Sequence, residues 1–301
     1  MSYWSQYSDF NAGIISAYSK VKSDKFVLVD GGAAGELSEP FDLAKSVILS
    51  VRFEPRGEGE VLKSPNEIYI DGGLWSEDRN GSLHVAKDPT TSSIFPPNIE
   101  FLKQFDDDYG VLPRDTQKLI EVPLRSIDSC VSNSEMPSPN FIKLDIHSSE
   151  LPALLGANNS LDSCVGLLVE TWNAEVHKGQ NLHYEVEKFA IENGFEVYDT
   201  ICAAGWHVKH NNQVNFNERR RYIGSEMLFI KANVPRELRL EKAFVLSLFG
   251  FYSAAQNLIS DFEQDGEEQF YRAIELAKLK SSKLTFKNVA KKAYRLLRRM
   301  V

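Results

Sequence analysis

Short apolar runs alternate with helical segments along most of the chain, and this alternation constrains the fold more than any other feature of the sequence. Several runs, such as FVLVD at 26–30 and VGLLVET at 165–171, are apolar almost throughout, which is typical of strands covered by helices on both faces of a sheet. Helical stretches such as 181–194 lie between the runs. This alternation predicts an α/β fold with a mostly parallel, doubly wound sheet. The last two runs, 195–199 and 226–232, lie close to the end of the pattern, so we expect an antiparallel last strand.

The strand pattern stops near Pro235. Residues 237–301 carry apolar residues at helical spacing, and about three helices are expected there. We therefore expect one domain over residues 1–236, which opens with a lead-in helix in residues 1–23. A helical C-terminal extension over residues 237–301 follows it.

Charge is distributed unevenly along the chain. The net charge is −8, but residues 278–301 hold nine Lys and Arg and no acid, which leaves 25 basic against 42 acidic residues in the rest. A body this acidic argues against nucleic acid as the main partner, because phosphate contacts need clustered cations. No apolar run reaches the roughly 18 residues of a membrane span, and no secretory leader opens the chain. We therefore expect a cytoplasmic protein.

The basic segment 278–301 has apolar residues at helical spacing on one face and cations on the other. Such a helix can pack on the protein with its basic face in solvent. It can also lie on an anionic membrane, such as the inner membrane face, or dock on an acidic partner. The sequence leaves these alternatives open.

An acid and a glycine-rich turn follow the first apolar run. Asp30 ends the run, and Gly31, Gly32 and Gly35 follow it; glycines allow a tight turn and close approach of the backbone to a ligand. A dinucleotide site would place a pyrophosphate on such a turn, but Asp30 would repel a phosphate and attract an ammonium or sulfonium group. Glu54 ends the next run, where it suits the hydroxyls of a ribose. A nucleoside with a cationic amino-acid tail satisfies both acids, and S-adenosylmethionine is such a ligand.

Several motifs occur in an order that one enzyme family shares. They are VDGGAAG, FEPR, the Ser-Ser that precedes Pro-Asn in TTSSIFPPN, FIKLDIHSSE and SEMLFIK, all between residues 24 and 232. In this order they resemble the FkbM family of S-adenosylmethionine-dependent methyltransferases, which implies a class I Rossmann-like fold. The resemblance further implies that Asp30, Gly32 and Gly35 border the methionine part of the cofactor. It implies that Glu54 holds the ribose and that Asp71 lies near the adenine.

The chain departs from the family pattern where the methyl acceptor should approach. The family usually has Lys-x-Asp-x-Gln/Glu-Gly-x-Glu where this chain has KLDIHSSE. His147 therefore stands in place of Gln or Glu, and Ser148 in place of Gly.

Asp145, His147 and Glu170 are the candidate catalytic residues. Asp145 and Glu170 end neighbouring apolar runs, where they can orient or deprotonate a hydroxyl, and a histidine suits a base near neutral pH. Each also has a structural interpretation, since Asp145 suits a helix cap and His147 suits an ordinary surface loop. The two carboxylates could hold magnesium, but such pairs are common on neighbouring strand ends. The remaining histidines lack ligand spacing, and we expect no metal.

These observations predict an O-methyltransferase that uses S-adenosylmethionine on a hydroxyl of a small molecule: a sugar, a glycan or another secondary metabolite. The acceptor class follows from the resemblance alone. One alternative is an NAD-dependent oxidoreductase, against which Asp30 argues. The other is a methyltransferase fold that has lost catalysis and serves as a binding or scaffold protein, and His147 and Ser148 leave room for it.

Overall fold

A computed structural model describes residues 8–32, 35–55, 65–261 and 266–297. The chain divides into two compact units. The first unit contains residues 1–26, 37–48 and 234–301, and the second contains residues 27–36 and 49–233. The division at residue 234 lies next to the boundary expected near Pro235. The lead-in helix, however, groups with the C-terminal residues and not with the rest of residues 1–236.

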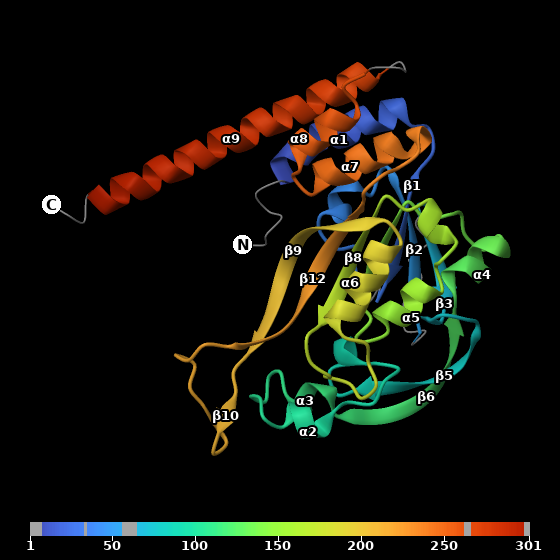
Figure 1. Ribbon diagram of the computed structural model, residues 1–301, viewed down its shortest axis with the longest axis vertical. Coiled ribbons are helices and arrows are strands. Elements are labelled where there is room, and N and C mark those ends of the chain that lie inside the picture. The colour runs from blue at the N-terminus through green and yellow to red at the C-terminus, as the bar shows by residue number, and fades with distance from the viewer. Residues whose placement is uncertain (1–7, 33–34, 56–64, 262–265, 298–301) are drawn as a thin grey trace. The chain divides into compact units, whose positions relative to one another are not determined.

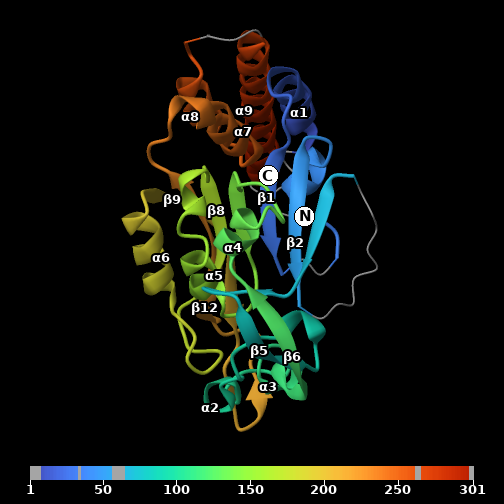
Figure 2. The same ribbon diagram turned by 90° about the vertical axis from the view of Figure 1, so that its right-hand side faces the viewer.

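The second unit is built on a seven-stranded sheet, which Figures 1 and 2 show from two sides. Its strands lie in the order β3-β2-β1-β7-β8-β12-β9. Their bounds are β1 Phe26–Gly31, β2 Ile48–Glu54, β3 Glu67–Asp71, β7 Phe141–Leu144, β8 Gly166–Trp172, β9 Phe195–Trp206 and β12 Arg221–Lys231. β2 pairs with β3, β1 with β7 and β7 with β8 in parallel, whereas β12 is antiparallel to both of its neighbours. The expected α/β fold with a mostly parallel sheet is confirmed, and the last strand is antiparallel.

Helices α4 (Ile127–Ser132), α5 (Glu150–Leu155) and α6 (His183–Glu192) cover one face of this sheet (Figure 1). The strands beneath them supply buried apolar side chains, which pack with buried apolar side chains of the helices in one core cluster. Its members include Ile142, Leu144, Leu167 and Val169 from the strands and Ala153, Leu154, Val186 and Ala190 from the helices. Because the central strands are buried, they read as continuous apolar runs in the sequence.

A smaller, three-stranded sheet lies in the same unit, in the order β4-β6-β5. Its strands are β4 Gly73–Leu74, β5 Arg79–Ala86 and β6 Thr116–Arg125. Many residues of β5 and β6 are exposed or half-buried. These strands therefore have no continuous apolar run in the sequence, and the sequence pattern did not predict them. A single 3₁₀ turn, Pro89–Thr91, follows β5. The carboxylate of Asp88 begins it by accepting a hydrogen bond of 3.0 Å from the Thr90 amide.

The second unit also contains four further short elements. They are helices α2 Ile99–Leu102 and α3 Val111–Arg114 and the two-stranded pair β10 Lys209–His210 and β11 Gln213–Val214.

The first unit consists mainly of helices. They are α1 Ser8–Val21, α7 Arg239–Leu248, α8 Tyr252–Leu258 and α9 Glu267–Leu297. Tyr18 of α1 stacks on Phe244 of α7 with ring centroids 4.0 Å apart, and Phe270 of α9 lies against the same tyrosine. Aromatic packing of this kind joins the N-terminal helix to the C-terminal ones.

The helices of residues 237–301 differ in number and limits from those expected. The first expected helix is interrupted at Gly250, whose φ of +84° suits glycine. The last two expected helices are continuous as α9. Side chains beyond Ser282 lie outside the described residues, so the amphipathic face expected for 278–301 stays a prediction. None of the helices in the described ranges is both long and apolar enough to cross a membrane.

Candidate active site

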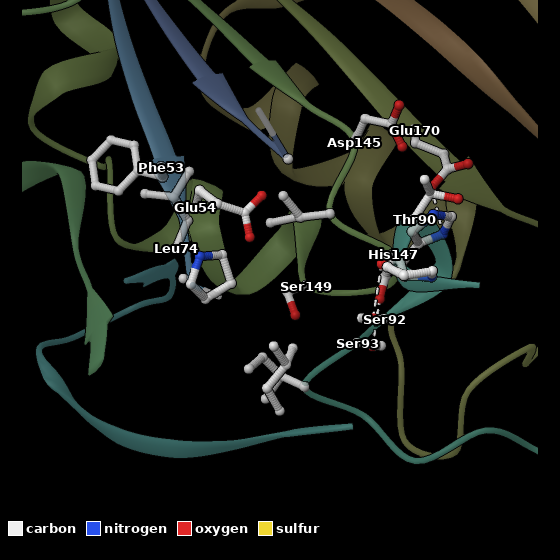
Figure 3. Close-up of a pocket in the computed structure, with 17 residues that line it drawn as sticks. Phe53, Glu54, Leu74, Thr90, Ser92, Ser93, Asp145, His147, Ser149 and Glu170 are labelled. Atoms are coloured by element: carbon white, nitrogen blue, oxygen red, sulfur yellow. Dashed lines mark hydrogen bonds and ion pairs between the residues drawn. The ribbon is translucent and has the colours of Figure 1, made fainter. Parts of the chain in front are cut away.

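A cavity of about 430 Å³ opens at the carboxyl ends of the strands of the central sheet. Gly32 follows β1, Glu54 ends β2, Asp145 follows β7 and Glu170 lies near the end of β8; all four line the cavity. Ligands of parallel α/β sheets bind at this edge. Figure 3 shows Glu54 on one side of the cavity and the pair His147 and Glu170 on the other.

The turn after β1 is packed against the loop after β7. Gly32 has a φ of +81°, and a Cβ atom built there would lie 1.9 Å from the carbonyl oxygen of Asp145. Gly31 is also crowded, by the side chains of Leu74, Leu144 and Ile146. These two glycines therefore allow the turn after β1 to lie close to the loop after β7. At Gly32 the contact is so close that a residue with a Cβ atom would not fit.

Asp30 is buried and does not line the cavity. Its carboxylate lies 3.2 Å from Nζ of Lys143 and 3.9 Å from Nε of Arg52, and both basic side chains are themselves buried. Burial lowers the pKa of Lys143, but the charges of Asp30 and Asp145 raise it, and the net direction is upward. The negative charge that the sequence argument assigned to a ligand is thus shared with two cations of the protein. A contact between Asp30 and the cofactor stays a prediction.

Arg52 also binds the turn that follows Asp30. Its guanidinium donates a hydrogen bond to the carbonyl of Gly35, which has a φ of +103°. Gly35 does not line the cavity, so its place in the structure supports a role in shaping the turn. Residues 33–34 of this turn lie outside the described residues.

Strands β2 and β3 each end in an acid, Glu54 and Asp71, and Glu54 is the one that faces the cavity (Figure 3). Its neighbour Asp71 lies opposite it in the β2–β3 register but is exposed and outside the cavity wall. Gly73 and Leu74 of β4 line the cavity in its place. Of the two acids expected near the nucleoside, the cavity wall therefore contains Glu54.

Asp145, His147 and Glu170 converge on the opposite side. Each offers one potential ligand atom, and these atoms lie within 4.8 Å of one another. Nδ1 of His147 lies 3.5 Å from Oε2 of Glu170. The three candidate catalytic residues thus form one cluster at the cavity, although His147 comes from a loop and the two acids from different strand ends.

The loop that carries His147 is held in an unusual backbone conformation. His147 has a φ of +49° and Ser148 a φ of +91°, a region that costs a non-glycine residue about 1–3 kcal/mol. The carboxylate of Glu150 accepts hydrogen bonds from the amides of Ile146 and Ser148, at 3.1 and 3.2 Å. Ser93 donates a 2.6 Å hydrogen bond to the carbonyl of His147. These contacts hold the backbone on both sides of His147 in this conformation.

A second set of buried polar groups fixes Ser148. Its hydroxyl lies 2.7 Å from Nδ1 of His177 and 3.0 Å from Oε1 of Gln180, and all three residues are buried. Burial lowers the pKa of His177 well below its usual value, so the ring is neutral at neutral pH. Ser148 stands where the family pattern has glycine, and its hydroxyl is held by a buried hydrogen-bond network with His177 and Gln180.

Burial dominates the electrostatics of the cluster. It raises the pKa of Glu170 well above its usual value, and the neighbouring charges of Asp145 and Glu150 act in the same direction. Burial likewise raises the pKa of Glu150 to about 8. For His147, burial lowers the pKa, and the opposing charge of Asp145 offsets it only in part. The cluster gathers more acidic than basic groups, and the side chains of His147 and Glu170 are mostly buried.

Trp172 and Trp206 are part of the packed interior near this cluster. Both are buried, and they form a core cluster with Phe105, Val176 and Ile223. Their rings are therefore packed against other side chains.

The segment after β5 supplies cavity residues that sequence reasoning did not assign. Thr90, Ser92 and Ser93 line the cavity beside His147 (Figure 3). Ser92 and Ser93 are the dipeptide of the TTSSIFPPN motif, which resembled the family but carried no expected role.

The sequence matches the model of the methyltransferase FkbM domain over residues 45–197, just over half of the chain. The chain belongs to the FkbM methyltransferase family. No curated protein shows significant sequence similarity to it.

Two solved structures show a loose similarity to this FkbM family member. A methyltransferase FkbM from Methylobacillus flagellatus KT is 16% identical, with a TM-score of 0.35, over 69% of this chain and 44% of that one. A Pyrococcus horikoshii protein provisionally assigned as an RNA methyltransferase is 11% identical, with a TM-score of 0.28, over 75% of this chain and 85% of that one. The chain thus spans less than half the length of the Methylobacillus protein.

The FkbM match includes most of the cavity wall. It contains Glu54, the segment 89–94 and the cluster of Asp145, His147 and Glu170, whereas Gly32 precedes it. Membership of a methyltransferase family therefore rests on the part of the chain that builds the site.

Proposed function

We propose that this protein is an S-adenosylmethionine-dependent O-methyltransferase with a class I Rossmann-like fold, and that its acceptor is a hydroxyl of a sugar, glycan or other small metabolite. The observation that carries the proposal is the cavity at the strand ends. It has one carboxylate for a ribose on one side and a cluster of polar groups for an acceptor on the other. The family membership supports methyl transfer, and the acceptor class rests on the sequence resemblance.

The residues on the Glu54 side fit a nucleoside. A carboxylate can accept hydrogen bonds from two ribose hydroxyls, and Phe53, Leu74 and Leu83 provide apolar surface for a base. The volume of about 430 Å³ lies within the range of small-ligand sites. Glu54 would hold the ribose, and the backbone after β1 would lie against the amino-acid part.

S-adenosylmethionine supplies a methyl group on a sulfonium: the acceptor oxygen bonds the methyl carbon, the carbon–sulfur bond breaks with its electrons left on sulfur, and the hydroxyl proton is released. The protein's main task is to align the acceptor for this displacement. Asp145, His147 and Glu170 lie where they can orient the hydroxyl and accept its proton.

Calorimetric titration with S-adenosylmethionine, S-adenosylhomocysteine and NAD tests the proposal. We expect binding of the first two and no binding of NAD. Glu54→Ala should weaken binding by about 1.5–3 kcal/mol, or roughly 10- to 150-fold, because a charged hydrogen-bonding group is lost. Asp71→Ala is the matched control, since Asp71 lies opposite Glu54 in the register but outside the cavity.

Tight binding of NAD at the same site would overturn the proposal in favour of an oxidoreductase. If S-adenosylhomocysteine binds but a panel of hydroxylated sugars and glycans is never methylated, a binding or scaffold role replaces catalysis.

A further inference from the structure

Two buried polar atoms in the Asp145–His147–Glu170 cluster face each other without a hydrogen bond. Within the described residues, neither Nδ1 of His147 nor Oε2 of Glu170 has a hydrogen-bond partner. Their separation of 3.5 Å is longer than a good hydrogen bond. Leaving two such atoms unsatisfied is unfavourable, because both are buried.

The spacing of these atoms suits ligands of one metal ion. Nitrogen and oxygen atoms that bind one ion at about 2.1 Å lie about 3.0 to 3.4 Å apart when adjacent, and about 4.2 Å apart when opposite. The His147–Glu170 separation is 3.5 Å, and all three potential ligand atoms lie within 4.8 Å. Small side-chain rotations would complete the site.

The imidazole of His147 presents an unbonded ring nitrogen to the cluster. Its Nδ1 is buried, has no hydrogen-bond partner among the described residues and lies 3.5 Å from Oε2 of Glu170. A neutral imidazole nitrogen that accepts no hydrogen bond can offer its lone pair to a metal. Ser93 reinforces the geometry through the carbonyl of His147.

The charges around the cluster leave a cation to be supplied. Asp145, Glu150, Glu170 and Glu226 interact electrostatically there. Arg114 opposes them, while the nearby Lys143 already pairs with Asp30. Two carboxylates and one neutral imidazole form a donor set that first-row divalent ions accept.

We propose that Asp145, His147 and Glu170 bind a divalent cation of the Mn²⁺ to Zn²⁺ series beside the cofactor cavity. Three protein ligands leave further coordination positions for oxygen atoms of the acceptor. The inference deepens the proposed function, on which it rests. The acceptor class becomes one that presents two neighbouring oxygens, such as a vicinal diol, and the ion promotes release of the hydroxyl proton to solvent. His147 is then a ligand and not the base.

Titration of the full-length protein with Mn²⁺ alone, followed by electron paramagnetic resonance of the free ion, tests this site. We expect one bound ion per chain, and at least a tenfold loss of affinity in Glu170→Gln and in His147→Ala. His183→Ala is the matched control. His183 also pairs with an acid, Glu187 of α6, at 3.0 Å, but it is not one of the three proposed ligands. Binding of S-adenosylhomocysteine to each variant shows that the fold and the cofactor site remain.

Absence of bound Mn²⁺ in the wild type, or equal binding by the wild type and both cluster variants, would overturn the metal site. So would stoichiometric displacement of Mn²⁺ by S-adenosylmethionine but not by neutral S-adenosylhomocysteine, since the cluster would then receive the sulfonium. Because S-adenosylhomocysteine binding is measured separately, a failed metal site leaves the proposed methyltransferase intact. If the protein binds Mn²⁺ but neither S-adenosylmethionine nor S-adenosylhomocysteine, the metal site stands and the proposed methyltransferase function fails.

Discussion

Asp30 and Glu54 lie at the ends of neighbouring strands, and from the sequence both were expected to face a ligand. In the structure Asp30 is buried between Lys143 and Arg52, whereas Glu54 lines the cavity. Lys143 lies opposite Asp30 in the β1–β7 register, and Arg52 comes from β2. Pairing across three strands thus turns one acid into a structural group. The other acid, Glu54, forms part of the cavity wall.

The largest expected effect concerns the turn that follows Asp30. Gly32→Ala should lower the free energy of unfolding by about 4 kcal/mol, because it combines a positive φ with a clash against the Asp145 carbonyl. Gly35→Ala, with a positive φ but no atom within 4 Å of the added Cβ, should lower it by only about 1–2 kcal/mol. Urea denaturation of both variants measures the difference, and equal losses would show that the clash is relieved.

Asp30→Asn should have the next largest effect. It keeps the shape of the side chain but leaves the buried Lys143 and Arg52 short of one counter-charge, so unfolding should become easier by about 3 kcal/mol. Arg52 retains Glu67 at 3.6 Å, and for this reason we expect the lower part of the range for broken buried pairs. Denaturant unfolding provides the measurement, with Asp71→Asn as an exposed control. If the Asp30→Asn protein is as stable as the wild type but fails to bind S-adenosylmethionine, Asp30 is a cofactor-binding residue and not a structural one.

Glu54→Ala should change stability least, by less than about 1 kcal/mol, since Glu54 is half-buried at the cavity. The same variant should show the loss of nucleoside affinity described above. Thermal unfolding with and without S-adenosylhomocysteine separates the two quantities: the melting temperature without ligand should stay near that of the wild type, and its rise on adding ligand should shrink. A large loss of stability without ligand would mean that Glu54, like Asp30, is mainly structural.

Local patterns in the sequence carried much of the fold. Buried strands such as FIKL at 141–144 are apolar because helices cover them, so their position could be predicted. The strands β5 and β6 could not, because their residues are largely exposed or half-buried. The helix limits in 237–301 depended on Gly250, whose role as a helix end becomes visible only through its positive φ.

The candidate site was partly predictable for a similar reason. The strand-end positions of Glu54, Asp145 and Glu170 follow from where parallel strands end, and all three line the cavity. Ser92 and Ser93 could be noticed as a motif, but no local rule brings them beside His147, because that contact joins segments 54 residues apart.

The sequence by itself determined the α/β class, the strand ends at which a ligand would bind and membership of a methyltransferase family, because these depend on local apolar patterns and ordered motifs. Only the tertiary structure decided which charged groups line the cavity and which are buried in ion pairs. Lys143 and Arg52 neutralise Asp30, and a loop with two positive φ values brings His147 to Glu170. Charge and solvation depend on neighbours in space, and those neighbours come from distant parts of the chain.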